Sequence, residues 1–406
     1  MQIAASTSKG SNAAVLQILF AIGIGHFIND SMQAIVPALY PILQNEMMLS
    51  YTEIGWIAFV LNMTSSVLQP VFGLATDKKP MPFLLSLGMF LAFLGVISIT
   101  FAPNFMIVLL SVIFIGLGSA IFHPEGSRVA YLASGTKRGL GQSIYQVGGN
   151  AGNAMAPILT YAIFLPFGQK GGIWISVLPL LGIFLLLYVG KWYKNKLLEG
   201  ATQKTSKMEI KDTNGFTNNI KTAMILILFI TFIRSWYVAG MGSFYQFYLI
   251  HDYGISIRNA QIILFAYLIA GVVGTLVGGA LSDRFGKKNV IVFSMVASTP
   301  LAMVLPNVSI GYVVPIFMFV GFIMFSSFSI IVVYAQQLLP GKVGLVSGLV
   351  TGLAFGLGAI GSVALGNLAD IYSVKFIMIL CSLLPLIGLV SFFLPNDLKP
   401  NFSNKP

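Results

Sequence analysis

The sequence predicts an all-α membrane protein, built from twelve transmembrane helices in two pseudo-symmetric six-helix halves. The first observation behind this fold class is composition. The 406 residues are 56% hydrophobic and only 9% charged, with a mean hydropathy of +0.87, whereas soluble domains carry about 25% charged residues. A chain this apolar cannot cover itself with polar groups, so lipid must surround it. The second observation is a loop motif that occurs twice.

The repeated motif is short and charged. Gly73-x-x-x-Asp77-Lys78-Lys79 lies between two apolar segments, and a fuller copy lies between two others in the second half, as Gly279-x-x-x-Asp283-Arg284-x-Gly286-Lys287-Lys288. A helical protein that repeats a loop at half its length indicates duplication. Duplicated helical bundles in membranes are typical of transporters that alternate access around a midplane site. We therefore expect Asp77, Asp283 and Arg284 to serve gating.

Each half contains six apolar segments long enough to span a membrane, for which a helix needs about 20 residues. They are 14–42, 52–74, 81–102, 105–131, 140–165 and 172–193, followed by 221–249, 257–281, 289–306, 310–337, 343–369 and 375–395. The predicted organisation is an N-terminal half (1–193), a polar linker (194–219) and a C-terminal half (220–406). The other connections are short and leave no room for a soluble catalytic domain, and a phosphate-loop motif is absent.

The net charge is +11, but the placement of the basic residues indicates membrane topology and not binding of nucleic acid. If both termini are cytoplasmic, only Lys170, Arg258 and Lys375 face outward, and Arg128 and Arg234 fall within spans. All other Lys and Arg lie on the cytoplasmic side, as the positive-inside rule requires. The sequence thus predicts a multi-pass protein with both termini in the cytoplasm.

Ionisable groups inside spans are costly and usually functional, and the first span carries several. His26, Asn29, Asp30 and Gln33 share one helix face at spacings of three and four residues. That face should line a central cavity. Asp30 could carry a proton or be permanently paired to hold helices together. His26 could bind substrate, adjust Asp30 or form a packing hydrogen bond.

The fourth span ends in Phe122-His123-Pro124-Glu125-Gly126-Ser127-Arg128. Glu125 and Arg128 are three residues apart on a helix and can pair. Glu125 and His123 are candidates for proton coupling. Arg128 could also reach Asp77 in the first loop motif and act as a gate latch, or it could form a structural pair.

Two further spans carry candidate substrate contacts. The fifth presents Gln146, Asn150 and Asn153 on one face, where amides could bind a polar solute or join helices. The seventh has Arg234 near its centre without an acidic residue in its own span. Its partner could be Asp30 or an anionic substrate, since a guanidinium matches carboxylate and phosphate geometry.

Long strings across both halves resemble the fosmidomycin resistance protein branch of the major facilitator superfamily. They include His26-Phe27-x-Asn29-Asp30, Tyr40-Pro41-x-Leu43-Gln44, Leu68-Gln69-Pro70, Thr76-Asp77-Lys78-x-Pro80-Met81-Pro82, Phe122-His123-Pro124-Glu125-x-Ser127-Arg128, Gln142-Ser143-Ile144-x-Gln146-Val147-Gly148-Gly149-Asn150 and Tyr334-Ala335-Gln336-x-Leu338-Leu339-Pro340-Gly341. The resemblance covers the whole chain, although Lys79-Pro80 departs from the usual motif in the first copy.

This resemblance implies a drug exporter of the bacterial inner membrane that exchanges drug for protons. Fosmidomycin is a small anionic phosphonate, and the family places a basic residue where Arg234 lies. We expect Arg234, His26 and the fifth-span amides to bind substrate, and Asp30, Glu125 and His123 to carry the proton. No metal, cofactor or catalytic residue is expected, and the partners are protons, the small anionic solute and the lipid bilayer around a monomer.

Two other functions are weighed against export. An uptake symporter or uniporter for a small organic anion would have the same fold, because the sequence does not decide direction. An intramembrane enzyme using His123 and Glu125 would need a nucleophile–base pair or a metal pattern such as His-Glu-x-x-His, and the sequence supplies neither. We therefore expect a transporter and not an enzyme.

Overall fold

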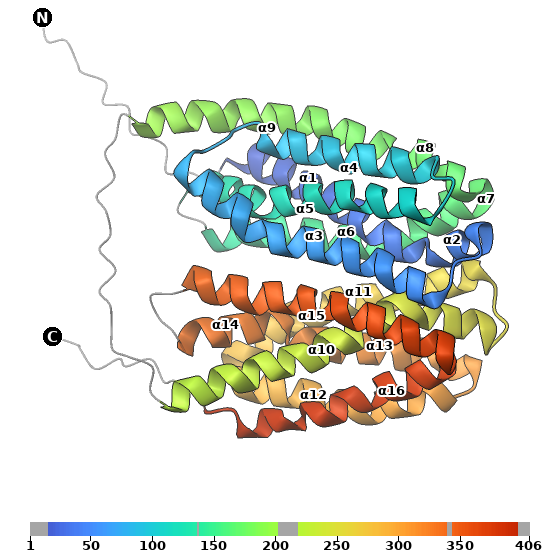
Figure 1. Ribbon diagram of the computed structural model, residues 1–406. Helices are drawn as coiled ribbons and strands as arrows, with labels where there is room; N and C mark the ends of the chain where they lie inside the picture. The colour runs from blue at the N-terminus through green and yellow to red at the C-terminus, as the bar shows by residue number, and fades with distance from the viewer. Residues whose placement is uncertain (1–14, 136–137, 202–217, 339–342, 397–406) are drawn as a thin grey trace, which may run out of the picture.

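The computed structural model describes residues 15–135, 138–201, 218–338 and 343–396, and every regular element within these ranges is a helix. Figure 1 shows two groups of helices, one above the other, with N-terminal helices in blue to green and C-terminal helices in yellow-green to red. The predicted all-α fold is confirmed for this part of the chain.

The N-terminal group begins with two helices where one span was expected. α1 ends at Ala38, and α2 begins at Tyr40 with Pro41 in its first turn, where a missing amide donor costs nothing. The elements of this group are α1 (Leu16–Ala38), α2 (Tyr40–Met47), α3 (Tyr51–Lys78), α4 (Leu84–Thr100), α5 (Phe105–Ala133), α6 (Arg138–Leu159), η1 (Thr160–Phe164), α7 (Leu165–Phe167), η2 (Gly168–Gly171), α8 (Gly172–Ile175) and α9 (Val177–Ala201).

The C-terminal group contains an interruption that the apolar pattern did not predict. The expected span 310–337 divides at Ser327, between α13 and α14. The elements are α10 (Asn218–His251), α11 (Ile257–Phe285), α12 (Lys287–Val304), η3 (Leu305–Asn307), α13 (Ile310–Ser326), α14 (Phe328–Leu338), α15 (Val343–Ile371), α16 (Val374–Ile387) and η4 (Gly388–Phe393).

Nine helical stretches of the described residues are long and apolar enough to cross a membrane. One of them, Ile144–Glu199, is 56 residues long and contains two of the predicted spans, while Leu84–Thr100 and Gly356–Ile371 are apolar but shorter. The number twelve therefore stays a prediction. The predicted domain limits also stay predictions, because α9 continues to Ala201 and residues 202–217 lie outside the described residues.

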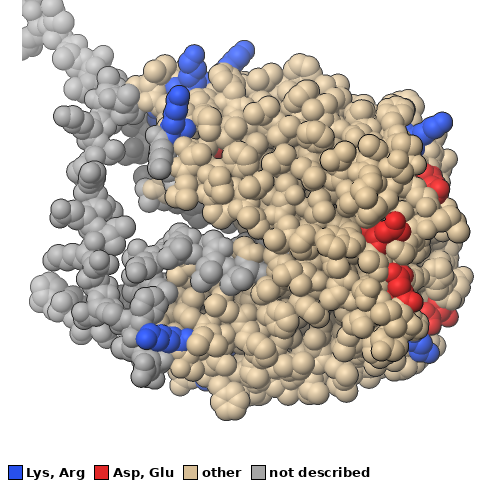
Figure 2. All heavy atoms as spheres, in the orientation of Figure 1, with Lys and Arg blue, Asp and Glu red and all other residues tan. Residues whose placement is uncertain are grey.

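The two ends of the bundle differ in charge. We call the end where α9 stops and α10 starts the linker end; the described chain also begins and finishes there (Figure 1). Figure 2 shows Lys and Arg at both ends, and most of the visible Asp and Glu at the opposite, far end. Four acids lie next to helix ends on this side: Glu46 near the end of α2, Glu53 in the first turn of α3, Asp252 after α10 and Asp370 at the end of α15. Among the described residues, Lys191, Lys194, Lys196 and Lys221 lie at the linker end, near the end of α9 and the start of α10, as the sequence predicts relative to the chain ends.

Helix starts at the far end are fixed by side-chain caps. The Ser50 hydroxyl accepts from the main-chain amide of Glu53, and the Glu53 carboxylate accepts from the main-chain amide of Ser50. This reciprocal pair is a capping box at the start of α3. Asn104, Ser256 and Ser373 cap α5, α11 and α16 in the same region. Each cap satisfies an amide that the helix leaves without a partner.

Close packing within each half depends on glycines that face a neighbouring backbone. Between α6 and α1, a Cβ on Gly148 would lie 2.1 Å from the carbonyl oxygen of Gly23. Between α11 and α13, a Cβ on Gly278 would lie 2.0 Å from the carbonyl oxygen of Ser326. Small residues at such positions let helices approach closely in lipid, where hydrophobic association between helices is weak.

We expect Gly278→Ala to lower the melting temperature of the purified protein, because a methyl group there must displace the α13 backbone. Overpacking of this kind typically costs about 1–3 kcal/mol. Gly279→Ala is the matched control, since no atom lies within 4 Å of a Cβ at that neighbouring position. Thermal unfolding in detergent, followed by intrinsic fluorescence, measures both. Equal melting temperatures would contradict the packing described for α11 and α13.

Candidate functional site

A cluster of ionisable side chains lies inside the N-terminal half, between α1 and α5. His26 and Asp30 lie one turn apart on α1, and His123 comes from α5. The Asp30 carboxylate lies 3.4 Å from His26 Nε2 and 3.5 Å from His123 Nε2. His26 and Asp30 are only 3% and 8% exposed. The structure therefore brings three predicted site residues together from two distant segments.

Both imidazole rings are oriented by main-chain carbonyls. His26 Nδ1 lies 2.7 Å from the carbonyl oxygen of Tyr145, and His123 Nδ1 lies 2.9 Å from that of Ser119. A carbonyl oxygen only accepts, so each Nδ1 must carry the proton that it donates. Each Nε2 is consequently the atom turned toward Asp30. The Tyr145 ring stacks on His26 at 4.0 Å between centroids and fixes that ring further.

Two asparagines complete the contacts of the carboxylate. Asn29 donates to Asp30 Oδ1, and Asn153 from α6 donates to Oδ2, each at 3.0 Å. The α6 backbone comes this close because residue 149 is glycine: a Cβ there would lie 2.5 Å from His26 Nε2 and 2.7 Å from Asp30 Oδ2. Asn153 thus belongs to the cluster.

The other two predicted amides on α6 lie outside this contact. Gln146 is exposed and Asn150 is half-buried, and neither donates to Asp30. A role in substrate binding stays a prediction for both residues. It also stays a prediction for His26, which in this structure contacts Asp30.

A second charged pair lies on α5 toward the linker end. Arg128 Nη1 lies 3.3 Å from Glu125 Oε1 and donates to the carbonyl oxygen of Thr76 at 2.6 Å. Glu125 is fully buried, at 0% exposed. The predicted pairing of Glu125 with Arg128 is present, and Arg128 reaches the residue before Asp77 through its main chain.

The gating residues of the loop motifs are described only in part. The side chains of Asp77 and Asp283 lie outside the described residues, so a latch that includes them stays a prediction. Arg284 is exposed, with its guanidinium carbon 5.3 Å from the centre of the Phe285 ring.

Arg234 is buried in the C-terminal half, and of the two partners considered for it, Asp30 does not contact it in this structure. Asp30 has its own histidine and asparagine partners in the other half. Arg234 Nε instead donates to the carbonyl oxygen of Met324 at 3.2 Å, and the guanidinium lies 4.7 Å from the centre of the Phe328 ring. The side chain is therefore held against a carbonyl and an aromatic face.

This arginine lies beside the interruption between α13 and α14. Met324 lies in the last turn of α13, which ends at Ser326, and its carbonyl also accepts from the Ser327 hydroxyl at 3.3 Å. Phe328, on which the guanidinium stacks, is the first residue of α14. Within the described part of the chain, Arg234 Nη2 is buried and has no hydrogen-bond partner.

Other unpaired polar atoms from the same part of the C-terminal half were not predicted. The hydroxyls of Tyr237 and Tyr267 and the indole nitrogen of Trp236 are buried, and none has a hydrogen-bond partner among the described residues. Tyr237 and Trp236 follow Arg234 on α10, and Tyr267 comes from α11. A tyrosine in an apolar segment usually indicates packing or an interface belt, so these residues did not stand out as site candidates.

The two halves are joined at the far end by residues that the sequence did not single out. Asp370 at the end of α15 accepts from the amides of Tyr51 and Thr52 at 2.8 and 2.7 Å, and from the Thr52 hydroxyl at 2.6 Å. A carboxylate at the start of α3 is favoured by the helix dipole and by its free amides. The contact therefore pairs a charge on one half with a helix N-terminus on the other.

Two glutamines make a second connection between the halves. Gln246 donates to the carbonyl oxygen of Pro37 at 2.7 Å, and Gln261 donates to that of Ala38 at 3.0 Å. Both glutamines are buried, and both acceptors lie in the last turn of α1. All hydrogen bonds between the halves in which both residues are described lie at this far end.

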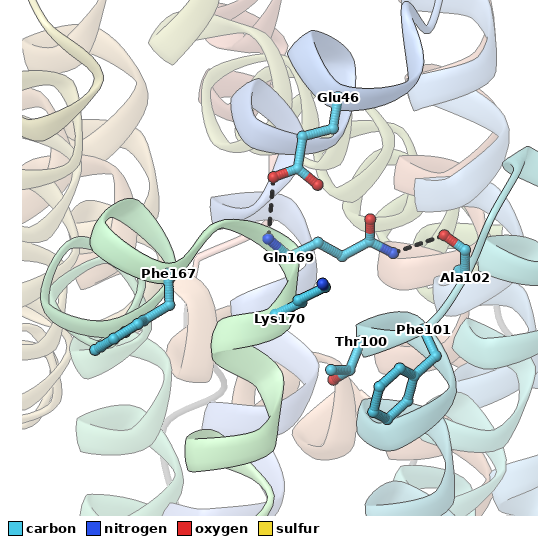
Figure 3. Close-up of a pocket in the computed structure, with 7 residues that line it drawn as sticks. All are labelled: Glu46, Thr100, Phe101, Ala102, Phe167, Gln169 and Lys170. Atoms are coloured by element: carbon cyan, nitrogen blue, oxygen red, sulfur yellow. Dashed lines mark hydrogen bonds between the residues drawn. The ribbon is translucent and has the colours of Figure 1, made fainter.

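A polar pocket of about 360 Å³ also lies at the far end, but within the N-terminal half. The Glu46 carboxylate accepts from the main-chain amide of Gln169 at 3.1 Å, and the side-chain amide of Gln169 donates to the carbonyl oxygen of Ala102 at 2.8 Å (Figure 3). These polar groups bind one another and tie the η2 turn to α2 and the end of α4. The hydrogen bonds around this pocket thus stabilise the η2 turn. The lining of the pocket includes neither Asp30 nor Arg234.

The fold and the buried charges define a polytopic membrane transporter, with two helical groups that each enclose an ionisable site. The chain belongs to the Major Facilitator Superfamily, whose family model matches residues 22–362 and again 227–406. It is 48% identical to the "Uncharacterized MFS-type transporter YfnC" of Bacillus subtilis, over 97% of this chain and 96% of that one. It is 40% identical to the "Fosmidomycin resistance protein" of Escherichia coli, again over 97% and 96%. The resemblance predicted from the sequence is confirmed.

A solved structure supports the fold independently. A bacterial homologue of the lysosomal transporter Spinster, in an inward-facing and unoccupied conformation, aligns with a TM-score of 0.74 over 95% of this chain and 97% of its own. The sequence identity is 14%, so this likeness concerns the fold alone.

We expect Asp370→Asn to open the far end, because it removes the charge that binds the start of α3. Hydrogen bonds to charged groups contribute about 1.5–3 kcal/mol, which corresponds to roughly a tenfold or larger change in population. Spin labels at Asn45→Cys and Asn307→Cys, in a Cys381→Ser background, would report longer distances by pulsed electron resonance. Asp252→Asn, at an exposed acid of the same end, is the control. An unchanged distance distribution in Asp370→Asn would refute the assigned role of this contact.

Proposed function

We propose that this protein is a proton-coupled efflux antiporter for fosmidomycin-like anionic drugs, acting by alternating access as a monomer in the bacterial inner membrane. The family and the relative named as a fosmidomycin resistance protein support drug transport. The observation that carries the anionic substrate is Arg234, a buried cation whose Nη2 has no hydrogen-bond partner among the described residues.

An arginine in lipid surroundings needs an anion or several acceptors to offset its desolvation. Arg234 has one carbonyl and aromatic faces in this structure. A phosphonate could take two parallel hydrogen bonds from the guanidinium. Interrupted helices recur at substrate sites of transporters, where their free ends face the ligand, and the α13–α14 break adjoins Arg234. These features together favour an anion site in the C-terminal half.

The proposed orientation places the linker end in the cytoplasm. The four lysines named above lie at that end, and most of the visible acidic residues lie at the far end (Figure 2), which agrees with the positive-inside rule. With this orientation the far-end contacts of Asp370, Gln246 and Gln261 close the outer side. The structure then corresponds to an inward-facing state, from which an exporter takes its substrate.

Asp30 is the proposed proton carrier, with His123 and Glu125 as its partners in coupling. Asp30 is buried among two imidazoles and two amides, and the His123 side chain, at 31% exposed, offers a route to solvent. His26 is 4% exposed in its side chain, and its contacts suit it to positioning Asp30. Rocking of the two halves, with gating by Asp77, Arg128, Asp283 and Arg284, would alternate the access of both sites.

We expect expression of the protein to protect a drug-sensitive bacterium from fosmidomycin, and Arg234→Ala to abolish this protection. Losing a charge-assisted hydrogen bond should weaken substrate binding roughly 10- to 100-fold. Arg234→Lys should recover only part of the protection, because an ammonium group lacks the bidentate geometry. Growth inhibition curves at matched membrane levels provide the measurement.

Lys191→Ala, at an exposed cation on α9, is the control for this experiment. Full resistance in Arg234→Ala would remove Arg234 from the binding site. Absence of protection by well-expressed wild type would discard the drug assignment while the family assignment stands. Uptake of a small organic anion would then become the first hypothesis.

We expect Asp30→Asn to uncouple transport from protons. In proteoliposomes with an imposed proton gradient, wild type should move labelled drug in the direction opposite to the downhill flow of protons. Asp30→Asn should still exchange labelled for unlabelled drug, but its rate should not respond to the gradient. Glu199→Gln, at an exposed acid on α9, should behave as wild type. A normal gradient response in Asp30→Asn would exclude this carboxylate as the carrier. Movement of drug and protons in the same direction would indicate symport instead.

A further inference from the structure

Three potential metal-ligand atoms converge at the N-terminal cluster. The ligand atoms of His26, Asp30 and His123 all lie within 4.8 Å of one another, and the two imidazole–carboxylate distances are 3.4 and 3.5 Å. Metal–ligand bonds of about 2.0–2.1 Å in a tetrahedral zinc site place the ligand atoms about 3.3 Å apart. Each imidazole nitrogen is thus at the right distance from the carboxylate, and a bound cation would draw together the ligand atoms that now lie up to 4.8 Å apart.

The chemistry of the ligands is already set for a metal. Each Nδ1 donates to a main-chain carbonyl, from Tyr145 or Ser119. Metal-bound histidines usually donate their second ring nitrogen in this way, which fixes the tautomer and leaves the other nitrogen to coordinate. The two Nε2 lone pairs thus point toward the same carboxylate.

Two lone pairs facing a carboxylate repel it unless a positive charge lies between them. His26 Nε2 is buried and has no hydrogen-bond partner among the described residues. A proton or a metal cation could supply the missing charge. Histidine at i and a second ligand at i+4 is a spacing that zinc sites on helices use, and α1 provides it with His26 and Asp30.

The cluster is closely enclosed on two sides and partly open on a third. Gly149 brings the α6 backbone against the cluster, where even a Cβ would lie 2.5–2.7 Å from the ligand atoms. The Tyr145 ring stacks on His26 and covers one side. The partly exposed His123 side chain marks the open side, where water could occupy a fourth position, as in zinc sites with three protein ligands.

We propose that His26, Asp30 and His123 form a binding site for a divalent transition-metal cation of the zinc type. Imidazole ligands select such metals over magnesium and calcium. This inference goes beyond drug transport and does not depend on the direction of transport or on the substrate.

The experiment uses the full-length protein without an affinity tag, treated with a chelator and purified in detergent. Isothermal titration with Zn²⁺ should give one saturable site per chain. Titration with Co²⁺ should give the intense visible absorption of a cobalt ion in a tetrahedral site. His123→Gln should weaken Zn²⁺ binding at least about 100-fold. Loss of a group that only hydrogen-bonds to a metal ligand already costs about 10- to 100-fold in affinity, and His123 would be a ligand itself.

Two further variants make the result specific. Gly149→Ala should weaken binding although it keeps all three ligand residues, because a Cβ there would crowd the ligand atoms of His26 and Asp30. His251→Gln removes the remaining histidine of the chain, which is exposed at the end of α10, and should leave binding unchanged. Melting temperatures of all variants would show whether each is folded.

Two outcomes would overturn the proposal. The first is wild-type protein without saturable binding below about 100 µM free Zn²⁺. The second is binding that persists in folded His123→Gln and disappears in His251→Gln, which would indicate an adventitious ion only. Either result leaves the transport proposal to its own tests, because none of these measurements involves drug or a proton gradient.

Discussion

The structure depends on one constraint: inside lipid, every polar group must find its partner within the protein. Asp30 satisfies this constraint with four side chains from three helices, at distances of 3.0 to 3.5 Å. Those contacts require α1, α5 and α6 to lie close together, and Gly149 makes the approach of α6 possible. The cluster and the packing of the N-terminal half are therefore one feature, since neither could form without the other.

The C-terminal half meets the same constraint only in part. Arg234 has a carbonyl and aromatic rings, but its Nη2 and the hydroxyls of Tyr237 and Tyr267 lack partners among the described residues. Unsatisfied buried groups are expensive, so a transporter can retain them where a ligand is to complete them. The two halves thus differ in the sign of the charge that they bury. One encloses a carboxylate among imidazoles and amides, and the other encloses an arginine held by a carbonyl and aromatic rings.

Local patterns in the sequence were enough for the fold class and for part of the site. Helical spacing placed His26 and Asp30 on one face, and the Glu125–Arg128 pair followed from the same rule. Contacts across helices were beyond these patterns, so the meeting of His123 with Asp30 and the separation of Arg234 from Asp30 came only from the structure. The break at Ser327 has no proline or glycine next to it, and the nearest proline in that span is Pro315. Asp370, Gln246 and Gln261 lie near helix ends. Polar residues are common there, so their type and position did not indicate a contact between the halves.

The far-end contacts use main-chain groups that helices leave over. Pro37 and Ala38 offer carbonyls from the last turn of α1, and Tyr51 and Thr52 offer amides from the first turn of α3, none of which needs to break a helical bond to take part. When the halves separate there, water can replace each partner at once. The seal is therefore made of bonds whose loss leaves both helices intact. Of the four N-terminal residues in these contacts, Thr52 adds a side-chain bond, from its hydroxyl to Asp370, whereas the others take part through their main chain alone.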